Sequence, residues 1–392
     1  MTDVVILAGA RTPVGSFMGA LAPLTAPQLG AVAIKEAVKR ASVKPSDVEE
    51  VILGCVLTAA VGQSPARQAL LGAGLPKETS ALTIGKVCGS GLKAVMLASS
   101  AIKAGDASLV VAGGMESMSN APHALPGSRN GYRMGNIQII DTMVNDGLWD
   151  PYHKVHMGTC AEKCATEYKI TRAMQDEFSA ESYRRAQEAI KAGKFKDEIV
   201  PVSIPSKKGD PVLVDTDEEP GKGNIAKLKD LRPAFDKEGT VTAGNASSIN
   251  DGAAAVVVAS AEKAKELGVK PIARIVAYAQ ASREPEWFTM APADAMEKVL
   301  KKANMKVSDI DLWEVNEAFA VVALANNNKL GIPADKVNVN GGAVAIGHPI
   351  GASGARILVT LLYALKANKK RYGLASLCIG GGEAVALIVE AL

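Results

Sequence analysis

The chain has 392 residues, a formal net charge of +3 and only 4% aromatic residues. Its length allows two or three domains with sizeable cores, and the small, evenly spread charge, without a basic stripe interleaved with aromatics, argues against nucleic-acid binding. The chain has no run of about 18 uncharged apolar residues, so no membrane span is expected. The N-terminus lacks the features of a secretory signal, and five cysteines, an odd number, argue against a disulfide framework and favour a reducing, cytoplasmic location.

Predicted strands and helices alternate through the first 118 residues. A buried strand at 3–8 is followed by a turn at 9–13, and Thr25 and Pro27 open a helix. The segment Ser90–Ala104 is apolar nearly all round and precedes a glycine, which predicts a buried helix capped by Gly105. Further strands are expected at 51–55 and at 109–112, the latter ending at the glycine pair 113–114.

The chain changes character between about residues 119 and 244, where Gly, Pro, Lys and Asp become more frequent. This part contains one clear amphipathic helix, at 171–192, and a segment at 205–223 that has the composition of an exposed loop. We interpret residues 120–244 as an insertion.

Regular alternation resumes with a strand at 252–258, and an internal repeat then becomes visible. Residues 39–48 match 301–310 at an offset of about 262, and the Ser-Gly pair at 90–91 matches that at 353–354. The sequence therefore predicts a duplicated α/β fold in five layers (αβαβα), with two related mixed sheets and the helices at Ser90 and Ser353 buried between them. The expected domains are an N-terminal half at 1–119 with 245–269, the insertion, and a C-terminal half at 270–392.

Cys88 and His348 occupy corresponding loops of the two halves. Cys88 lies where a buried helix begins, and backbone N–H groups and the helix dipole there favour a thiolate and can lower a cysteine pKa to about 3.5–7.5. His348 lies between flexible glycines and is a candidate general base for that thiol. The alternatives are a small buried cysteine and a hydrogen-bonded loop histidine.

Two further residues follow predicted strands of the second half. Cys378 precedes three glycines, whose N–H groups could bind an oxyanion, although a structural turn with an inert thiol gives the same pattern. Asn316 follows the strand at 311–315, where it could hold a water or a substrate oxygen, or cap a helix beginning at Glu317.

Two rival sites were weighed. His153, His156, Cys160 and Cys164 have spacings that could ligate zinc, but Lys154 intrudes and no second Cys-x-x-Cys pair supports them, so no metal is expected. The glycines of 347–354 are typical of a phosphate loop, but no Gly-Lys-Ser/Thr follows.

Four motifs in order resemble the signatures of thiolases: VCGSG at 87–91, NEAF at 316–319, GHPIG at 347–351 and CIGGG at 378–382. The resemblance runs from Val4 to the C-terminus. Residues 118–162 resemble the biosynthetic subgroup, the acetyl-CoA acetyltransferases. This resemblance implies reversible Claisen condensation of two acetyl-CoA to acetoacetyl-CoA and CoA, with no cofactor and with ping-pong kinetics.

The resemblance also implies roles for individual residues. Cys88 would be acylated, His348 would activate it, and Cys378 would take a proton from the second acetyl group. Asn316 would hold a water in one oxyanion hole, and the N–H groups of Cys88 and Gly380 would form the other. The implied substrate and CoA contacts are Ser247, His156, Met157, Phe319, Ala318, Phe235, Leu231, Ala243 and Phe288.

The insertion would carry the CoA site, and residues 120–150 resemble a loop that ties dimers into a homotetramer. Some positions depart from the family pattern: Gly85 replaces a usual Asn, Gly221 stands where an Arg is frequent, and Phe288 stands at a usual Met. The missing charge could come from Lys207, Lys208, Lys222 or Lys227.

Three other functions remain open at this point. A degradative 3-ketoacyl-CoA thiolase would prefer longer acyl chains, a decarboxylating ketoacyl synthase commonly has a histidine in place of Cys378, and a non-catalytic acyl-CoA-binding protein would never acylate Cys88. If both thiols serve one acetyl group, oxidation could join Cys88 and Cys378 and switch the enzyme off. Peptide mapping that finds no such link, while mild oxidation lowers activity, would reject this hypothesis.

Overall fold

The computed structural model describes residues 2–206 and 209–392. Its centre is one ten-stranded sheet in the order β14-β15-β16-β13-β1-β12-β5-β3-β4, with β2 (Gly15–Ser16) paired to β12. The other strands are β1 (Val4–Arg11), β3 (Glu50–Gly54), β4 (Ser80–Ile84), β5 (Leu109–Ser117), β12 (Asn250–Ser260), β13 (Ala273–Ser282), β14 (Leu312–Val315), β15 (Tyr372–Ile379) and β16 (Glu383–Ala391).

The sheet order confirms the duplication predicted from the sequence repeat. The run β3-β5-β12-β1 corresponds to β14-β15-β16-β13, and in each run the outer pair is parallel and the others are antiparallel. Even the register shifts correspond, between Ile6 and Ala8 in β1 and between Ile275 and Ala277 in β13. The two halves, expected as two sheets, join into one because β1 pairs with β13 over two residues.

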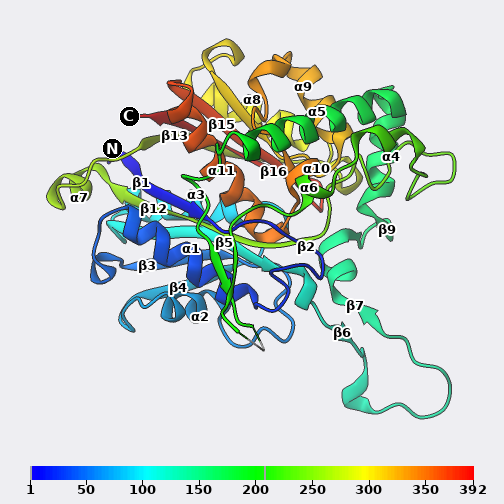
Figure 1. The fold of residues 1–392 in the computed structure, drawn as a ribbon, viewed down its shortest axis with the longest axis horizontal. Helices are drawn as coiled ribbons and strands as arrows, with labels where there is room; N and C mark the ends of the chain where they lie inside the picture. The colour runs from blue at the N-terminus through cyan, green and yellow to red at the C-terminus, as the bar shows by residue number, and fades with distance from the viewer. Residues whose placement is uncertain (1, 207–208) are drawn as a thin grey trace.

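Helices lie on both faces of the sheet and between its two halves (Figure 1). The central helices α3 (Ser90–Ala104) and α11 (Ile350–Ala367) pack against each other, while α1 (Ala26–Arg40) and α2 (Pro65–Gly72) cover one half and α8 (Ala291–Ala303) covers the other. This confirms the five-layered α/β fold. Helix α11 is long and apolar enough to cross a membrane, but 83% of that stretch is buried inside the protein, as in a core helix.

Strand β5 is longer than its sequence indicates. We expected it to end at Gly113, but it continues to Ser117. A Cβ at Gly114 would lie 2.0 Å from the carbonyl oxygen of Gly351, and a Cβ at Gly113 would lie 2.1 Å from that of Ala254. These glycines therefore allow close approach of neighbouring backbones inside a strand rather than ending it.

The insertion contains α4 (Met157–Glu167), α5 (Arg172–Lys191), a short α6 (Glu219–Lys222) and strand pairs. The pairs are β6 (His123–Ala124) with β7 (Ile140–Asp141), β8 (Trp149–Asp150) with β9 (Val155–His156), and β10 (Val202–Ile204) with β11 (Val212–Val214). The segment between β6 and β7 projects away from the body (Figure 1). Other helices are α7 (Ala261–Glu266), α9 (Ala320–Leu330) and α10 (Ala343–Ile346).

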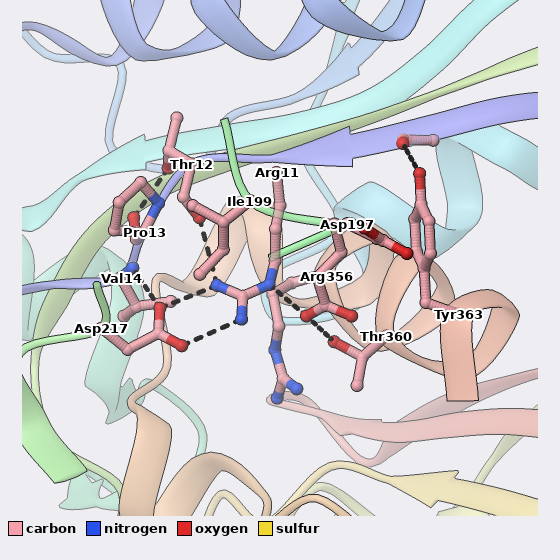
Figure 2. Close-up of polar contacts among 12 residues, drawn as sticks. Arg11, Thr12, Pro13, Val14, Asp197, Ile199, Asp217, Arg356, Thr360 and Tyr363 are labelled. Carbon is pink, nitrogen blue, oxygen red and sulfur yellow. Dashed lines mark hydrogen bonds and ion pairs between the residues drawn. The ribbon is translucent and has the colours of Figure 1, made fainter. Parts of the chain in front are cut away.

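A buried arginine ties the insertion to the sheet. Arg11, expected in a turn, continues β1 and is 0% exposed; its guanidinium contacts Asp217 at 2.7 and 2.9 Å and Glu198 at 2.6 Å (Figure 2). Burial opposes the charge of Arg11, but these two carboxylates outweigh it and raise the arginine pKa. Asp217 lies in the segment expected to be an exposed loop, so that expectation is wrong for this part: a buried ion pair draws the segment inward.

Candidate active site

Four of the five catalytic residues expected from the sequence, Cys88, His348, Cys378 and Gly380, line one cavity of about 490 Å³. Cys88 comes from the turn before α3, His348 from the loop before α11, and Cys378 and Gly380 from the end of β15. The duplicated halves thus bring their corresponding loops to one place, and the insertion supplies the rest of the wall.

Cys88 is held by a strained turn. The preceding residue, Val87, has a positive φ of 42°, an uncommon conformation for a β-branched residue. Burial raises the pKa of Cys88 to about 11, even though the N–H groups of Gly380 and of Cys88 itself point at the sulfur and favour the thiolate. The expected low pKa is therefore wrong for the resting protein: Cys88 is a thiol and needs a base.

His348 is arranged to be that base. Its Nδ1 lies 2.6 Å from the Ser353 hydroxyl, and that hydroxyl donates its one proton to the carbonyl of Pro349. Nδ1 must then carry the ring proton, which leaves the lone pair on Nε2. Nε2 is buried without a hydrogen-bond partner among the described residues. Burial, with a smaller contribution from Arg356, lowers the pKa of His348 to about 3, so the ring is neutral.

Cys378 is a buried thiol on the same cavity. Burial, then the nearby Cys88, raises the pKa of Cys378 well above its usual value. Gly381 and Gly382, with φ of 89° and 86°, turn the chain after β15, and the N–H of Gly380 points at Cys88. All five cysteines are free, and the disulfide hypothesis for Cys88 and Cys378 stays a prediction.

Asn316, the fifth expected residue, is buried and is not among the residues that line the cavity. The residue is 1% exposed, and neither atom of its side-chain amide has a hydrogen-bond partner in the described part of the chain. The capping alternative is wrong, because the helix that follows begins only at Ala320. An unpaired buried amide is costly, and a water or ligand oxygen beside it would remove that cost.

The apolar end of the cavity is closed by aromatic side chains. His156 stacks on Phe235 with ring centroids 4.7 Å apart, and Phe319 meets Phe235 and Phe288 edge-to-face at 6.1 and 6.5 Å. Met157, Ala243, Ala318 and Ser247 also line the wall, and the Ser247 hydroxyl donates to the carbonyl of Ala318. Of the predicted contacts on this side, Leu231 does not line the cavity; it packs beside Gly244 and is 36% exposed.

Sequence reasoning did not single out several wall residues, all but one of which lie outside the four motifs. They are Ser16, Phe17, Met118, Gly147, Leu148, Glu219, Ala234, Thr242, Ala246, Ser248, Ile249 and Ile350. Among the candidate cations, Lys222 lines the cavity and Lys227 does not, while Lys207 and Lys208 lie outside the described residues. Gly221 does not line the cavity either.

Glu116 is a buried residue that sequence reasoning missed. Its carboxylate accepts hydrogen bonds from the backbone N–H groups of Val56, Leu57 and Gly351, at 2.9–3.2 Å. Burial raises its pKa to about 7. The side chain joins the loop after β3 to the first turn of α11, beside the His348 loop. A glutamate in an otherwise apolar strand is the signal that could have found it.

The four residues of the rival zinc site do not converge. Cys160 and Cys164 are buried in an apolar cluster, while the imidazole of His153 lies between the carboxylates of Asp150 and Glu286. His156 Nδ1 instead accepts the N–H of Gly158 at the start of α4. Across residues 2–206 and 209–392, no group of three or more His, Cys, Asp or Glu could hold a metal ion.

An ion pair joins the two loops that surround the Cys88 sulfur. Lys86, two residues before Cys88, pairs with Glu383, which follows the glycines after Cys378. Their side chains are 19% and 36% exposed. The pair therefore links the turn that carries Cys88 to the loop that contains Gly380.

We expect Lys86→Met and Glu383→Gln each to slow acylation of Cys88 about fivefold, about 1 kcal/mol, the upper range for a partly exposed pair. The double variant should cost little more than either single one, because the second change removes no further interaction. Rapid-quench acylation rates of all four proteins measure the coupling. Fully additive losses would show that the pair does not act as a unit.

Comparison with known proteins agrees with this geometry. Residues 4–262 match the family model described as thiolase, N-terminal domain, and residues 269–391 match that of the thiolase C-terminal domain. The chain is 60% identical over 391 residues to an acetyl-CoA acetyltransferase of Cupriavidus necator, covering 100% of both chains. It is 54% identical to acetyl-CoA acetyltransferase 1 of Arabidopsis thaliana, covering 99% of this chain and 94% of that one.

Two solved structures share the whole fold. The crystal structure of the Bacillus anthracis acetyl-CoA acetyltransferase superposes with a TM-score of 0.98 at 45% identity, covering 100% of this chain and 99% of that chain. The Acat5 thiolase of Ascaris suum, solved in complex with coenzyme A, gives 0.95 at 46% identity and covers all of both chains. With both family models matched and the catalytic loops gathered at one cavity, the chain belongs to the thiolase family.

Proposed function

We propose that the protein is an acetyl-CoA C-acetyltransferase that condenses two acetyl-CoA to acetoacetyl-CoA and CoA, and catalyses the reverse. The observation that carries this proposal is the neutral His348, with its free Nε2 in the same cavity as the Cys88 thiol. The full-length similarity to acetyl-CoA acetyltransferases supports the substrate.

In the first half-reaction, His348 Nε2 takes the proton of Cys88, and the sulfur attacks the thioester carbonyl of acetyl-CoA. The N–H groups of Cys88 and Gly380 stabilise the oxyanion. Collapse of the tetrahedral intermediate breaks the bond to CoA, whose sulfur takes the proton of the Cys378 thiol, and leaves acetyl-Cys88, a Cys378 thiolate and a protonated His348.

In the second half-reaction, the Cys378 thiolate takes a proton from the methyl group of another acetyl-CoA. The burial that raises the Cys378 pKa makes this thiolate a stronger base. A water held by Asn316, together with His348, stabilises the enolate oxygen. The enolate carbon then attacks acetyl-Cys88, which releases acetoacetyl-CoA, and the freed Cys88 sulfur takes back the proton held by His348.

A degradative thiolase with longer substrates is the second candidate. The edge-to-face contact between Phe288 and Phe319 favours the short-chain reading, because two aromatic rings limit the length of the acyl end. The single cation on the cavity wall among the described residues, Lys222, is the proposed contact for the CoA phosphates.

We also propose a homotetramer, a dimer of dimers, in the cytoplasm. The projecting segment between β6 and β7 exposes large apolar side chains, namely Leu125, Tyr132, Met134, Ile137 and Ile139, which a second copy would cover. Strand β4 is a sheet edge with Leu82 42% exposed and offers a second contact. Sedimentation of a monomer would reject the assembly, and recovery from a membrane or secreted fraction would reject the location.

The function is tested by intact-protein mass after mixing with acetyl-CoA, for wild type and Cys88→Ser. We expect one acetyl group on wild type and a strong loss of labelling in the variant. A series of 3-ketoacyl-CoA substrates is expected to show fastest thiolysis with acetoacetyl-CoA. Faster turnover of longer chains would favour the degradative reading, and CoA binding without acetylation of either protein would favour a non-catalytic one.

A further inference from the structure

A second, larger concavity lies away from the catalytic cavity and shares no residue with it. It has a volume of about 1000 Å³ and forms where the end of α1, the segment after α5, the start of β13, the end of α11 and the C-terminus meet. Part of its wall, Asp197 and Tyr363, is visible in Figure 2. We name it the basic groove after its cationic lining: Arg40, Lys196, Lys270, Lys366, Lys369, Lys370 and Arg371.

The groove gathers positive charge. Its lining has seven cationic side chains against one acidic side chain, Asp197, and the terminal residue Leu392. Arg40 and Arg371 pair with Glu36 and Glu390, which do not line the groove, so the excess of positive charge lies on the five lysines. Because a concave surface lined by one sign of charge focuses its field, an anion would be drawn to this place.

Most of these cations lack a partner. Lys196, Lys270, Lys366, Lys369 and Lys370 form no ion pair within residues 2–206 and 209–392. The two arginines are different. Arg40 pairs with Glu36 and donates to the carbonyls of Glu198 and Ile199 and to the hydroxyl of Tyr363, and Arg371 pairs with Glu390. The five lysines are therefore the cations available to a ligand.

Helix capping explains only part of this cluster. Lys366 and Lys369 lie at the end of α11, where cations balance the negative end of the helix dipole. Lys196 and Lys270 come from two other segments and have no such role. Their convergence on one groove, with the like-charge repulsion it entails, points to a bound anion.

The groove also has an apolar side. Its floor offers apolar surface from Pro271, Ile272 and Leu392, the last 60% exposed, because Leu7, Leu362 and Leu365 are at most 5% exposed. A volume of this order suits a ligand of drug or nucleotide size. We propose that the basic groove binds an organic phosphate, with two or more phosphate charges on the lysines and an apolar or aromatic body on the floor.

Calorimetric titration of the full-length protein with ADP, inorganic pyrophosphate and adenosine tests the proposal at about 50 mM and about 200 mM salt. We expect ADP to bind with a Kd below about 1 mM at the lower salt, more tightly than pyrophosphate and with adenosine weakest. Binding should weaken at the higher salt, because exposed charges are screened. Equal affinities for ADP and pyrophosphate would reject the role of the apolar floor.

Variants assign the binding to the groove. The triple variant Lys366→Gln/Lys369→Gln/Lys370→Gln is expected to weaken ADP binding at least about tenfold. A matched triple on α8, Lys298→Gln/Lys301→Gln/Lys302→Gln, removes the same charge elsewhere and should leave binding unchanged. No binding up to about 10 mM, equal affinity in wild type and the groove triple, or loss of ADP binding in Lys222→Gln at the catalytic cavity would overturn the proposal. Acetyl-CoA turnover of the groove triple serves as the folding check.

Discussion

His348→Asn is expected to lower kcat for acetoacetyl-CoA thiolysis by about 10²–10⁴-fold, the usual contribution of a positioned general base. Cys88 rests as a thiol because burial raises its pKa to about 11, so attack requires a proton acceptor. Asparagine fills similar space but cannot take that proton. KM should change little, because the aromatic wall of the cavity is unaltered.

A second histidine of the same cavity provides the control. His156 stacks on Phe235 and caps α4 through Nδ1, and its Asn variant should act chiefly on KM. Ser353→Ala keeps the imidazole but removes the group that holds its Nδ1, so kcat should fall by less than in His348→Asn. A kcat of His348→Asn within about threefold of wild type would remove His348 from the role of base.

The pH dependence of stability gives an independent readout for His348. Its pKa is about 3 in the folded protein against 6.5 as the ordinary value. Between these pH values the unfolded chain binds a proton at this histidine that the folded protein does not bind. The free energy of unfolding of wild type therefore falls by about 1.4 kcal/mol per pH unit as the pH drops below 6.5. His348→Asn lacks this loss. Urea unfolding at several pH values should show that the free energy of unfolding of the variant rises relative to that of wild type only below about pH 6.5.

Sequence alone was sufficient where the signal is local. The apolar run from Ser90 with a glycine at 105 gave a helix with the observed bounds, and Gly105 has the left-handed φ of 86° expected of its cap. The repeat at 39–48 and 301–310 appears as two matching turns, in which Asp47 and Asp309 accept the N–H of Lys44 and Lys306 at the same 2.8 Å. Motif order gave the catalytic loops, and the duplication explains why they meet.

The expectations that were wrong concern residues whose conformation, pKa or burial depends on partners far away in the chain. Gly113 looked like a strand end, but a glycine is needed at this position because the backbone of β12 passes too close to leave room for a Cβ. The helix start at Cys88 suggested a low pKa, but burial by the whole fold determines the sign. Asp217 sits in a polar segment, and only the fold brings Arg11, 206 residues earlier, to it. Burial and long-range pairing are not encoded in a window of neighbouring residues.

That long-range pair leads to the largest expected effect on stability. Arg11→Met should lower the free energy of unfolding by about 3–5 kcal/mol, because it leaves the buried Asp217 and Glu198 without their cation. Arg371→Met is the control: this arginine pairs with Glu390 but its side chain is 67% exposed, so the loss should stay below about 1 kcal/mol. Urea denaturation of both variants against wild type measures the difference.

The same change should reach the end of the cavity that Glu219 and Lys222 line. Asp217 also accepts the N–H of Val14, and the next residue, Glu218, accepts those of Ser16 and Ala20. These contacts hold α6, whose Glu219 and Lys222 line the cavity, so Arg11→Met should raise KM for CoA more than it lowers kcat. Adding Glu198→Gln and Asp217→Asn removes the unpaired charges and should restore part of the stability. If the triple variant is no more stable than Arg11→Met, the lost free energy of unfolding comes from the packing of the arginine side chain and not from the unpaired carboxylates.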